Sequence, residues 1–304
     1  MGAYFDHGWW SLLIYCAVSG AVAAMVLRLL LTRLREFALD APNHRSLHET
    51  PVPRTGGWGL LTGTSVGLLL SQPEFQPGIV FAFIALLLVS VADDLRSLSA
   101  RLRFSVQILS VMVLLYSLAL PFVTPLSWVI WPLLVLTGVW VVNLYNFMDG
   151  MDGFAGSMTA IGFAALGAIC FLRNVPQIGI ICLLVATSSV VFLYYNWPRA
   201  QIFLGDAGST VIGLAVFAVS VAGWQQGAFG LVVPLLIFLP FWLDATVTLI
   251  IRMLRRERWW EAHRQHFYQR MALKHGVKTS LFIEVAVMVS TSLLALVLVA
   301  SGVA

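Results

Sequence analysis

The residues best suited to chemistry lie at positions 143–156, in the sequence NLYNFMDGMDGFAG. Two Asn and two Asp recur there at every third position, as Asn143, Asn146, Asp149 and Asp152, inside a strongly apolar chain. Taking polar groups of this kind out of water costs free energy unless they meet partners, so such a cluster is rarely idle. Carboxylates and amides at this density suit a metal-bound phosphate, and a polar turn without a ligand is the alternative.

The spacing limits the shape of this segment. Side chains three positions apart lie on adjacent turns of an α-helix, but the row drifts by about half a circle over nine residues. We therefore expect either a turn tightened toward three residues per turn or a helix that stops at Gly150 and Gly153. A helix end at these glycines would leave backbone N–H groups open to an anion.

Two adjacent carboxylates, Asp93 and Asp94, end the third apolar run. Such charges repel, which raises the proton affinity of one of them unless a cation neutralises the pair. The pair can hold Mg²⁺ or accept a proton from a phosphate. A solvated helix end paired with Arg96 accounts for it equally well.

The segment FLGDAGS, residues 203–209, places Asp206 between Gly205 and Gly208. The glycines let the backbone approach a ligand, and a carboxylate is a hard oxygen ligand. Asp206 alone would be better interpreted as a helix N-cap. Together with the two other acidic clusters, it is predicted to be a metal ligand.

The segment HRQHFYQR, residues 263–270, would place His263 and His266 on one helix face beside Arg264. Zinc is one candidate ligand, but a phosphate is favoured because no Cys or third His lies close in sequence. An amphipathic segment that rests on anionic lipid is the alternative.

Residues 40–57, DAPNHRSLHETPVPRTGG, contain three Pro and a Gly pair, which indicates an ordered loop. Arg45, His48 and Arg54 could donate hydrogen bonds to a phosphate there. The alternative is that they are ordinary basic residues of a cytoplasmic loop.

The composition is that of an integral membrane protein. Of 304 residues, 60% are hydrophobic and only 11% are charged, and the mean hydropathy is +0.89. Since no stretch of low hydropathy could form a separate soluble domain, residues 1–304 are expected to form a single membrane domain.

The apolar runs predict an all-α protein with about ten transmembrane helices, because a helix needs about 20 residues to cross the hydrocarbon. The second and third runs are short. The predicted spans are 9–31, 58–72, 77–92, 104–121, 126–142, 153–172, 176–195, 208–223, 229–251 and 280–302.

The basic residues predict the orientation. With the N-terminus and the C-terminus outside, all but Arg173 of the 18 Lys and Arg residues fall on the cytoplasmic side. The net charge of +4 is then explained by this bias and by contact with phosphates or anionic headgroups, and nothing indicates nucleic acid.

In this topology the polar segments all lie on the cytoplasmic face: 40–57, 93–103, 143–156, 199–209 and 252–278. One-sided chemistry favours an enzyme that takes a soluble cytoplasmic substrate and a lipid. The alternative is a transporter or lipid flippase that uses a midplane site at Asp244 and at the helix break in 143–156. Asp244 lies about two turns inside the ninth span, where an acid indicates function, and its role stays open.

These motifs, in this order along nearly the whole chain, resemble the polyprenyl-phosphate N-acetylhexosamine-1-phosphate transferases, of the glycosyltransferase family 4 type. HRQHFYQR and the first loop, residues 40–57, look most like the branch that starts O-antigen or related glycan synthesis on undecaprenyl phosphate. The peptidoglycan branch has consecutive His where this chain has His263-Arg-Gln-His266, which argues against a muramoyl-pentapeptide substrate.

The resemblance implies a reaction in which a UDP-N-acetylaminosugar and undecaprenyl phosphate give undecaprenyl-pyrophosphoryl-sugar and UMP, with Mg²⁺. It implies a multi-pass protein of the bacterial inner membrane with a cytoplasmic active site. The aminosugar stays open, as does the choice between direct attack and a covalent phosphoryl enzyme. Oligomeric state also stays open, with a homodimer as one option, because helix faces toward lipid and toward a partner are equally apolar.

The resemblance also implies roles for the candidate residues. The expected metal ligands of Mg²⁺ are Asp206 and Asp149. The expected catalytic residues are Asp93, Asp94, Asp149, Asp152, His263 and His266. The expected substrate-binding residues are Asn143, Asn146, Arg45, His48, Arg54, Gly205 and Arg264. Within these groups, the Asp93–Asp94 pair would meet the lipid phosphate, with one of the two acting as a base. Residues 263–270, which we call the histidine segment, would hold the pyrophosphate through His263, Arg264 and His266.

Overall fold

The computed structural model describes residues 8–40, 50–120, 127–258 and 263–303. These residues are mostly helical, and the strands among them form one short antiparallel pair, β1 (Leu39–Asp40) with β2 (Val52–Pro53). Within the same residues, eight helices are long and apolar enough to cross a membrane. The prediction of an all-α polytopic membrane protein is confirmed.

Most of the predicted spans are continuous helices. The third span, which seemed short in the sequence, is a 20-residue helix, whereas the second is a 16-residue helix, α2 (Gly56–Ser71), below the length of a full crossing. The eight long helices are α1 (Gly8–Arg33), α3 (Pro77–Arg96), α4 (Ala100–Ser117), α5 (Ser127–Phe147), α6 (Phe154–Leu172), α7 (Pro176–Asn196), α8 (Gly205–Gln225) and α12 (Val277–Ala300).

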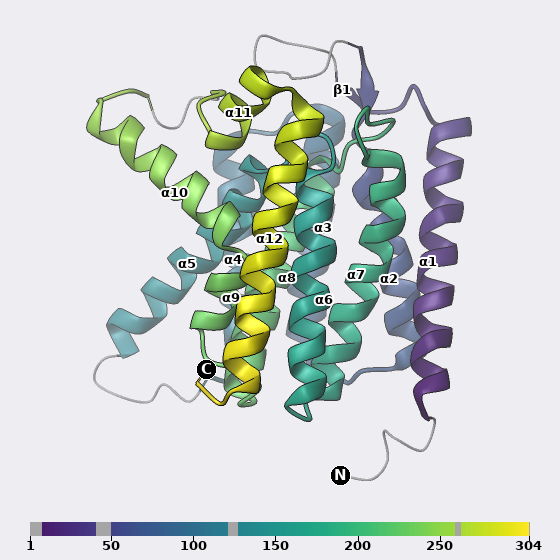
Figure 1. Ribbon diagram of the computed structural model, residues 1–304, viewed down its shortest axis with the longest axis vertical. Coiled ribbons are helices and arrows are strands. Elements are labelled where there is room, and N and C mark those ends of the chain that lie inside the picture. Colours follow the sequence, from purple (N-terminus) through teal and green to yellow (C-terminus); the bar gives the residue numbers. More distant parts are fainter. Residues whose placement is uncertain (1–7, 41–49, 121–126, 259–262, 304) are drawn as a thin grey trace.

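The ninth predicted span, 229–251, is not one helix, and that prediction was wrong. The chain forms a short α9 (Val232–Ile237) and then α10 (Leu239–Leu254), which slants away from the bundle in Figure 1. Pro240 is the physical reason, because it has no N–H with which to continue the hydrogen-bond ladder of α9. Hydropathy alone does not detect such a break, since Pro is common in membrane helices.

The helices run alternately up and down, and this gathers the polar segments at one end. α1 begins and α12 ends at the lower end of the bundle in Figure 1, while the described parts of the polar segments lie at the upper end. The short helix α11 (Phe267–His275) also lies at this upper end, above α12. We call it the polar end. That it faces the cytoplasm stays a prediction from the basic residues.

At the polar end, the first loop is tied to the start of α8. The backbone N–H groups of Gly56 and Gly57 donate to the carbonyl oxygens of Phe203 and Leu204, each at 2.8 Å. A Cβ atom on Gly57 would lie 2.4 Å from the Cα atom of Gly208, so the two chains approach as closely as glycine allows. This contact fixes the FLGDAGS segment against the loop that precedes α2.

Candidate active site

The 143–156 segment is a helix stop. α5 ends at Phe147 and α6 begins at Phe154. Between them Gly153 has a φ of +74°, which a side chain would strain, and its N–H donates to Asn196 Oδ1 at 2.9 Å. The spacing allowed either a tightened turn or a helix that stops, and the structure has the helix stop. The polar residues of this row therefore do not lie on a single helix face.

The four residues of this row therefore have different surroundings. Asn146, at the end of α5, donates through Nδ2 to Asp206 Oδ1 at 2.8 Å. Asn143, one turn earlier, donates to Gln107 Oε1 at 2.7 Å. Asp152, in the connection, accepts the backbone N–H of Ala200 at 3.0 Å. The last of these bonds holds the loop before α8.

Asp206 lies in the first turn of α8, next to a position that only glycine fits. Gly205 has a φ of +76°, and a Cβ atom there would lie 2.1 Å from the carbonyl oxygen of Arg54. The Gly205 N–H bonds to the carboxylate of Asp149. Asp149 and Asp206 are thus brought to the same helix start.

Asp94 caps α8 from a different helix. Its Oδ1 accepts the N–H of Asp206 at 2.9 Å and its Oδ2 accepts the N–H of Ala207 at 3.0 Å, and the residue is only 2% exposed. N–H groups at a helix start have no partner within the helix, and an anion there is favoured. Asp94 therefore orients the residue proposed to bind metal.

Asp93, its neighbour on α3, pairs with a cation that the sequence reading missed. Arg103 Nη1 on α4 lies 2.9 Å from Asp93 Oδ2 and 3.8 Å from Asp206 Oδ2. Because Asp93 and Asp94 are both buried, a solvated helix end paired with Arg96 is excluded. Arg103 is the last residue of the polar segment 93–103. Its positive charge was the only signal in the sequence that it could pair with the acids.

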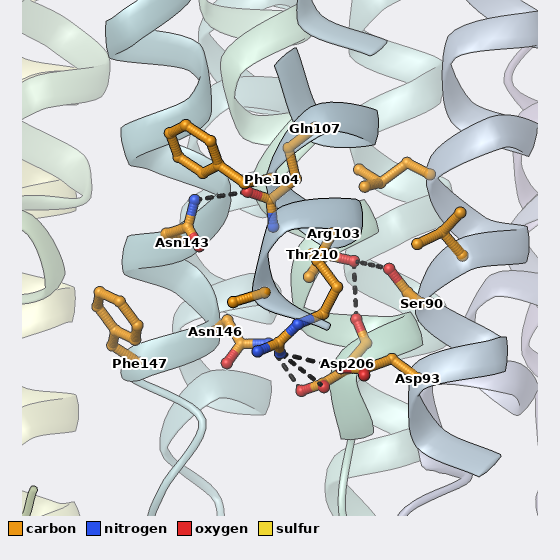
Figure 2. A pocket seen from close by; sticks show the side chains of 13 residues that line it. Ser90, Asp93, Arg103, Phe104, Gln107, Asn143, Asn146, Phe147, Asp206 and Thr210 are labelled. Carbon is orange, nitrogen blue, oxygen red and sulfur yellow. Dashed lines mark hydrogen bonds and ion pairs between the residues drawn. The ribbon is translucent and has the colours of Figure 1, made fainter. Parts of the chain in front are cut away.

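These side chains surround a cavity of about 160 Å³ between α3, α4, α5 and α8 (Figure 2). Small-molecule sites usually measure roughly 300 Å³ or more, so this cavity suits a phosphate group better than a whole nucleotide. Its polar lining is Ser90, Asp93, Arg103, Gln107, Asn143, Asn146, Asp206 and Thr210. Phe104 and Phe147 are among its apolar lining residues.

The polar lining has a charged layer near the helix ends and a neutral layer one turn deeper. The charged layer holds Asp93, Arg103 and Asp206. In the neutral layer the hydroxyl groups of Ser90 and Thr210 are 2.8 Å apart. The amide groups of Asn143 and Gln107 are bonded to each other, and in Figure 2 both pairs lie above Asp206 and Asp93. Sequence reading missed three of these residues, Ser90, Gln107 and Thr210, although polar side chains inside apolar runs could have signalled them.

The cluster carries more acidic than basic groups. Burial, and then the charges of Asp206 and Asp94, raise the pKa of Asp149 well above its usual range. Within the described residues, no group of three or more His, Cys, Asp or Glu side chains is already arranged as a metal site. Mg²⁺ is commonly held by one or two carboxylates together with substrate phosphates and water, and the oxygens of Asp206 and Asp149 fit that role.

The histidine segment lies at the same end but has a different structure from the one predicted. His263 and His266 do not share a helix face, because α11 begins only at Phe267 and His266 is its N-cap residue. The two rings nevertheless lie 4.8 Å apart. Burial, and then the charges of His266 and Arg252, lower the pKa of His263 to about 4, so this imidazole is neutral at physiological pH.

The histidine segment meets the acidic cluster through the end of α5. The ring of His266 is stacked 6.4 Å from the ring of Phe147, which lines the cavity. The Tyr268 hydroxyl donates to the Phe147 carbonyl oxygen at 3.1 Å. Within the described part of the chain, neither histidine bonds directly to Asp93, Asp149 or Asp206. The histidine segment and the acidic cluster are therefore neighbours without a direct bond.

The remaining candidates are the basic ones. Arg264 is exposed. Arg54 is half-buried, acts electrostatically on Asp94, and among the described residues its buried Nε has no hydrogen-bond partner. Arg45 and His48 lie outside the residues that the structure describes. Asn196 was not a candidate, yet its amide joins Gly153 to the carbonyl oxygen of Ile202 and so links two motifs.

Comparison with known proteins gives the family. Residues 77–224, from α3 to α8, match the model of glycosyl transferase family 4. A probable undecaprenyl-phosphate N-acetylglucosaminyl 1-phosphate transferase of Bacillus subtilis is 31% identical over 250 residues, which are 77% of this chain and 69% of the relative.

Two further relatives are less complete matches. An undecaprenyl-phosphate alpha-N-acetylglucosaminyl 1-phosphate transferase of Escherichia coli is 28% identical over 195 residues, 59% of this chain and 53% of the relative. A decaprenyl-phosphate N-acetylglucosaminephosphotransferase of Mycolicibacterium smegmatis is 29% identical over 266 residues, 74% of this chain and 65% of the relative. The acidic cluster lies inside the matched residues, and the chain belongs to glycosyl transferase family 4.

Proposed function

We propose that this protein transfers an N-acetylaminosugar 1-phosphate from a UDP-sugar to undecaprenyl phosphate, and that it releases UMP. The observation that carries the proposal is a phosphate-sized cavity at the polar end of membrane helices, lined by Asp93, Arg103 and Asp206. Asp94 and Asp149 are bonded to the backbone at the start of α8, next to Asp206. The names of the relatives, which all specify a polyprenyl phosphate and N-acetylglucosamine, support it.

In the proposed reaction, an oxygen of the lipid phosphate attacks the β-phosphorus of the UDP-sugar. The bond from that phosphorus to the bridging oxygen breaks, and UMP leaves with the electron pair. Phosphoryl transfer between anions depends on positioning and on neutralising charge. Mg²⁺, held by Asp206 and Asp149, would supply the second of these.

Arg103 is the residue best placed to receive the lipid phosphate. It is 42% exposed and already lies between two carboxylates, Asp93 and Asp206. A guanidinium group binds phosphate oxygens through two parallel N–H bonds. We therefore assign to Arg103 the orientation of the attacking phosphate, with Phe104 and Phe147 at the apolar wall of the cavity.

The two adjacent acids then have different tasks. Both oxygens of Asp94 accept backbone N–H groups of α8, so Asp94 is committed to holding Asp206 in place. Asp93 accepts the Leu98 N–H through Oδ1 and pairs with Arg103 through Oδ2, but it lines the cavity and is the remaining candidate proton acceptor. A lipid phosphate is already largely ionised near neutral pH, since the second pKa of a phosphate monoester is about 6, and the reaction needs no strong base.

The UDP-sugar would lie toward the surface of the polar end. Its diphosphate would be held by His263, Arg264 and His266, and by the basic residues of the first loop. Asp152 would shape this side of the site through its bond to Ala200. We place the reaction at the cytoplasmic face of a bacterial inner membrane, as the committed step of O-antigen or related surface-glycan synthesis.

The test is transfer by the purified protein in lipid nanodiscs. Undecaprenyl phosphate, Mg²⁺ and a panel of radiolabelled UDP-N-acetylaminosugars, with UDP-N-acetylglucosamine first, should give a lipid-linked product and UMP in equal amounts. Chelation with EDTA should abolish the product and added Mg²⁺ should restore it. Failure to form a lipid-linked sugar with every donor in the panel would overturn the proposal.

A transporter is the less favoured function. Its expected midplane acid, Asp244, is bonded to α11 at the polar end, and the acids of the candidate site, Asp93, Asp94, Asp149 and Asp206, also lie at that end. Single cysteines at Asp149 and Asp206 should react with an impermeant thiol reagent from the cytoplasmic side alone. Labelling from both sides would favour transport.

A further inference from the structure

Asp244 is a buried acid in α10 to which the proposed reaction gives no task. It is 6% exposed. Its Oδ1 accepts the backbone N–H of Phe267, and its Oδ2 accepts the backbone N–H of Tyr268, each at 2.9 Å. These are the first two residues of α11, whose N–H groups have no partner within their own helix. A carboxylate from one helix therefore caps another.

Two further groups complete the surroundings of this carboxylate. His266 Nδ1 and Thr248 Oγ1 each lie 3.1 Å from Asp244 Oδ1. The His266 residue is itself buried, and its ring is stacked on that of Tyr268 with centroids 5.8 Å apart. Asp244 thus contacts three consecutive residues, His266 to Tyr268, in the segment assigned to the diphosphate.

The same arrangement occurs at α8. There Asp94 accepts the N–H groups of Asp206 and Ala207, which are also consecutive residues at a helix start. In both places a buried carboxylate from another helix receives one N–H on each oxygen. In both places a residue assigned to the substrate or metal lies at the capped helix start. Asp206 donates one of the two N–H groups to its cap, whereas His266 directly precedes the two donors Phe267 and Tyr268.

From α11 the contact continues to the cavity. The Tyr268 hydroxyl bonds to the Phe147 carbonyl oxygen, and a Cβ atom on Gly150 would lie 2.2 Å from that hydroxyl. α11 can take up this position only because position 150 has no side chain. Asp244, α11 and the end of α5 are therefore in continuous contact.

We propose that Asp244 is a positioning residue, which holds His266 and the start of α11 against the α5 end of the active site. The inference rests on the proposed function for its effect on catalysis. The capping itself is independent of that function, and the experiments separate the two.

The first experiment compares Asp244→Asn with two controls. The amide can accept only one of the two N–H bonds and turns its own NH₂ group toward the other, so kcat should fall about tenfold or more. Thr248→Val removes a donor to the same carboxylate but none to α11. Glu284→Gln removes another acid, on α12, that acts electrostatically on Asp244 but, among the described residues, has no bond to α11. Both controls should stay within about twofold of wild type.

A double-mutant cycle tests whether the effect passes through His266. If Asp244 acts by positioning this ring, Asp244→Asn should cost little in a His266→Asn background, because the group to be positioned is already absent. If the two substitutions instead lower kcat by independent factors that multiply, Asp244 does not act through His266, and the positioning role would be overturned.

Hydrogen–deuterium exchange gives a readout that needs no activity. Exchange over residues 266–275 should rise in Asp244→Asn and stay unchanged over residues 205–212, and Thr248→Val should alter neither. If the wild-type protein transfers no sugar, the proposed function fails, but this measurement still shows whether Asp244 caps α11. Unchanged exchange and unchanged kcat in a folded Asp244→Asn protein would overturn the inference.

A second pair of variants covers the case in which Asp244→Asn does not fold. Phe267→Pro deletes the N–H that Asp244 accepts, at the first helical position where proline is tolerated. Phe267→Ala removes the same ring but keeps the N–H. The proline variant should show the lower kcat and the faster exchange in α11. Equal behaviour of the two variants would contradict the cap.

Discussion

Asp94 and Asp244 cap two helices in the same way, but the helices differ in how else they are held. α8 is a 21-residue helix in the centre of the protein, and its start is also bonded to the first loop. α11 has nine residues, most of its outer face is exposed, and it follows the oblique α10. The acidic site is therefore built on elements that the whole core supports, whereas the histidine segment begins a short helix whose start is held by Asp244 and by the reciprocal bonds of His266 and Gln269.

The charges of the two regions differ as well. The region around α8 gathers carboxylates, which suits a cation, and the region around α11 gathers imidazoles and arginines, which suits a diphosphate. The two regions meet at Phe147, and in the proposed reaction one substrate would span both. Substitutions in each region test whether the acidic region around α8 is the better supported of the two and the basic region around α11 the less supported.

The largest effect is expected from Asp206→Asn. It removes the charge proposed to bind Mg²⁺, so turnover should fall by about 100-fold or more. The backbone N–H that Asp94 accepts remains, and crowding among the acids is relieved, so the melting temperature should stay the same or rise. Transfer assays and thermal unfolding in detergent check this. Full activity would remove the metal role from Asp206.

Asp94→Asn should be next, and should affect both activity and stability. The amide leaves one buried N–H of α8 without an acceptor, which costs about 1–3 kcal/mol in the free energy of unfolding. Because α8 is central, the melting temperature should fall further than in Asp244→Asn, and activity should fall about tenfold or more. A larger loss of stability in Asp244→Asn would break the contrast between the two caps.

Arg103 should give an intermediate effect that depends on geometry as well as charge. Arg103→Gln should raise the KM for undecaprenyl phosphate and lower kcat, about tenfold in kcat/KM, and Arg103→Lys should recover part of this loss because it restores charge without the planar fork. Steady-state kinetics with varied lipid phosphate measure it. If only the KM for the UDP-sugar changed, Arg103 would belong to the other substrate.

The smallest effect is expected from the pH dependence of His263. Its pKa is about 4 in the folded protein against a usual 6.5, so below pH 6.5 the unfolded chain binds more protons and the folded state loses stability. Above pH 7 the residue should contribute no pH dependence. His263→Asn should lose less melting temperature than wild type between pH 7 and pH 5.5. Equal losses would show that other groups cause the acid sensitivity.

Much of the fold follows from local composition. Apolar runs near the length needed to cross a bilayer gave the spans, and most boundaries agree with the observed helices within a few residues, because bilayer thickness sets a length that each run must meet by itself. The break between α9 and α10 was missed, since one proline interrupts a run without lowering its hydropathy.

The candidate site was predicted in part. Asp149, Asn146 and Asp206 were chosen from composition, and the parity of the spans placed them at one end of the bundle. The partners of the acids were not predicted. Arg103 looked like one more cytoplasmic basic residue, and nothing in the spacing of His263 and His266 showed that a distant carboxylate would start the helix only at Phe267.

The amino-acid sequence by itself therefore determined which segments enter the membrane and which polar residues share an end of the protein, because both depend on transfer from water and on chain alternation. Only the tertiary structure decided which acids line the cavity and which are used in holding a helix start. Asp93 and Asp94 are neighbours of the same type, yet one is paired with Arg103 and the other is bonded to α8. That choice is made by contacts between helices far apart in the chain.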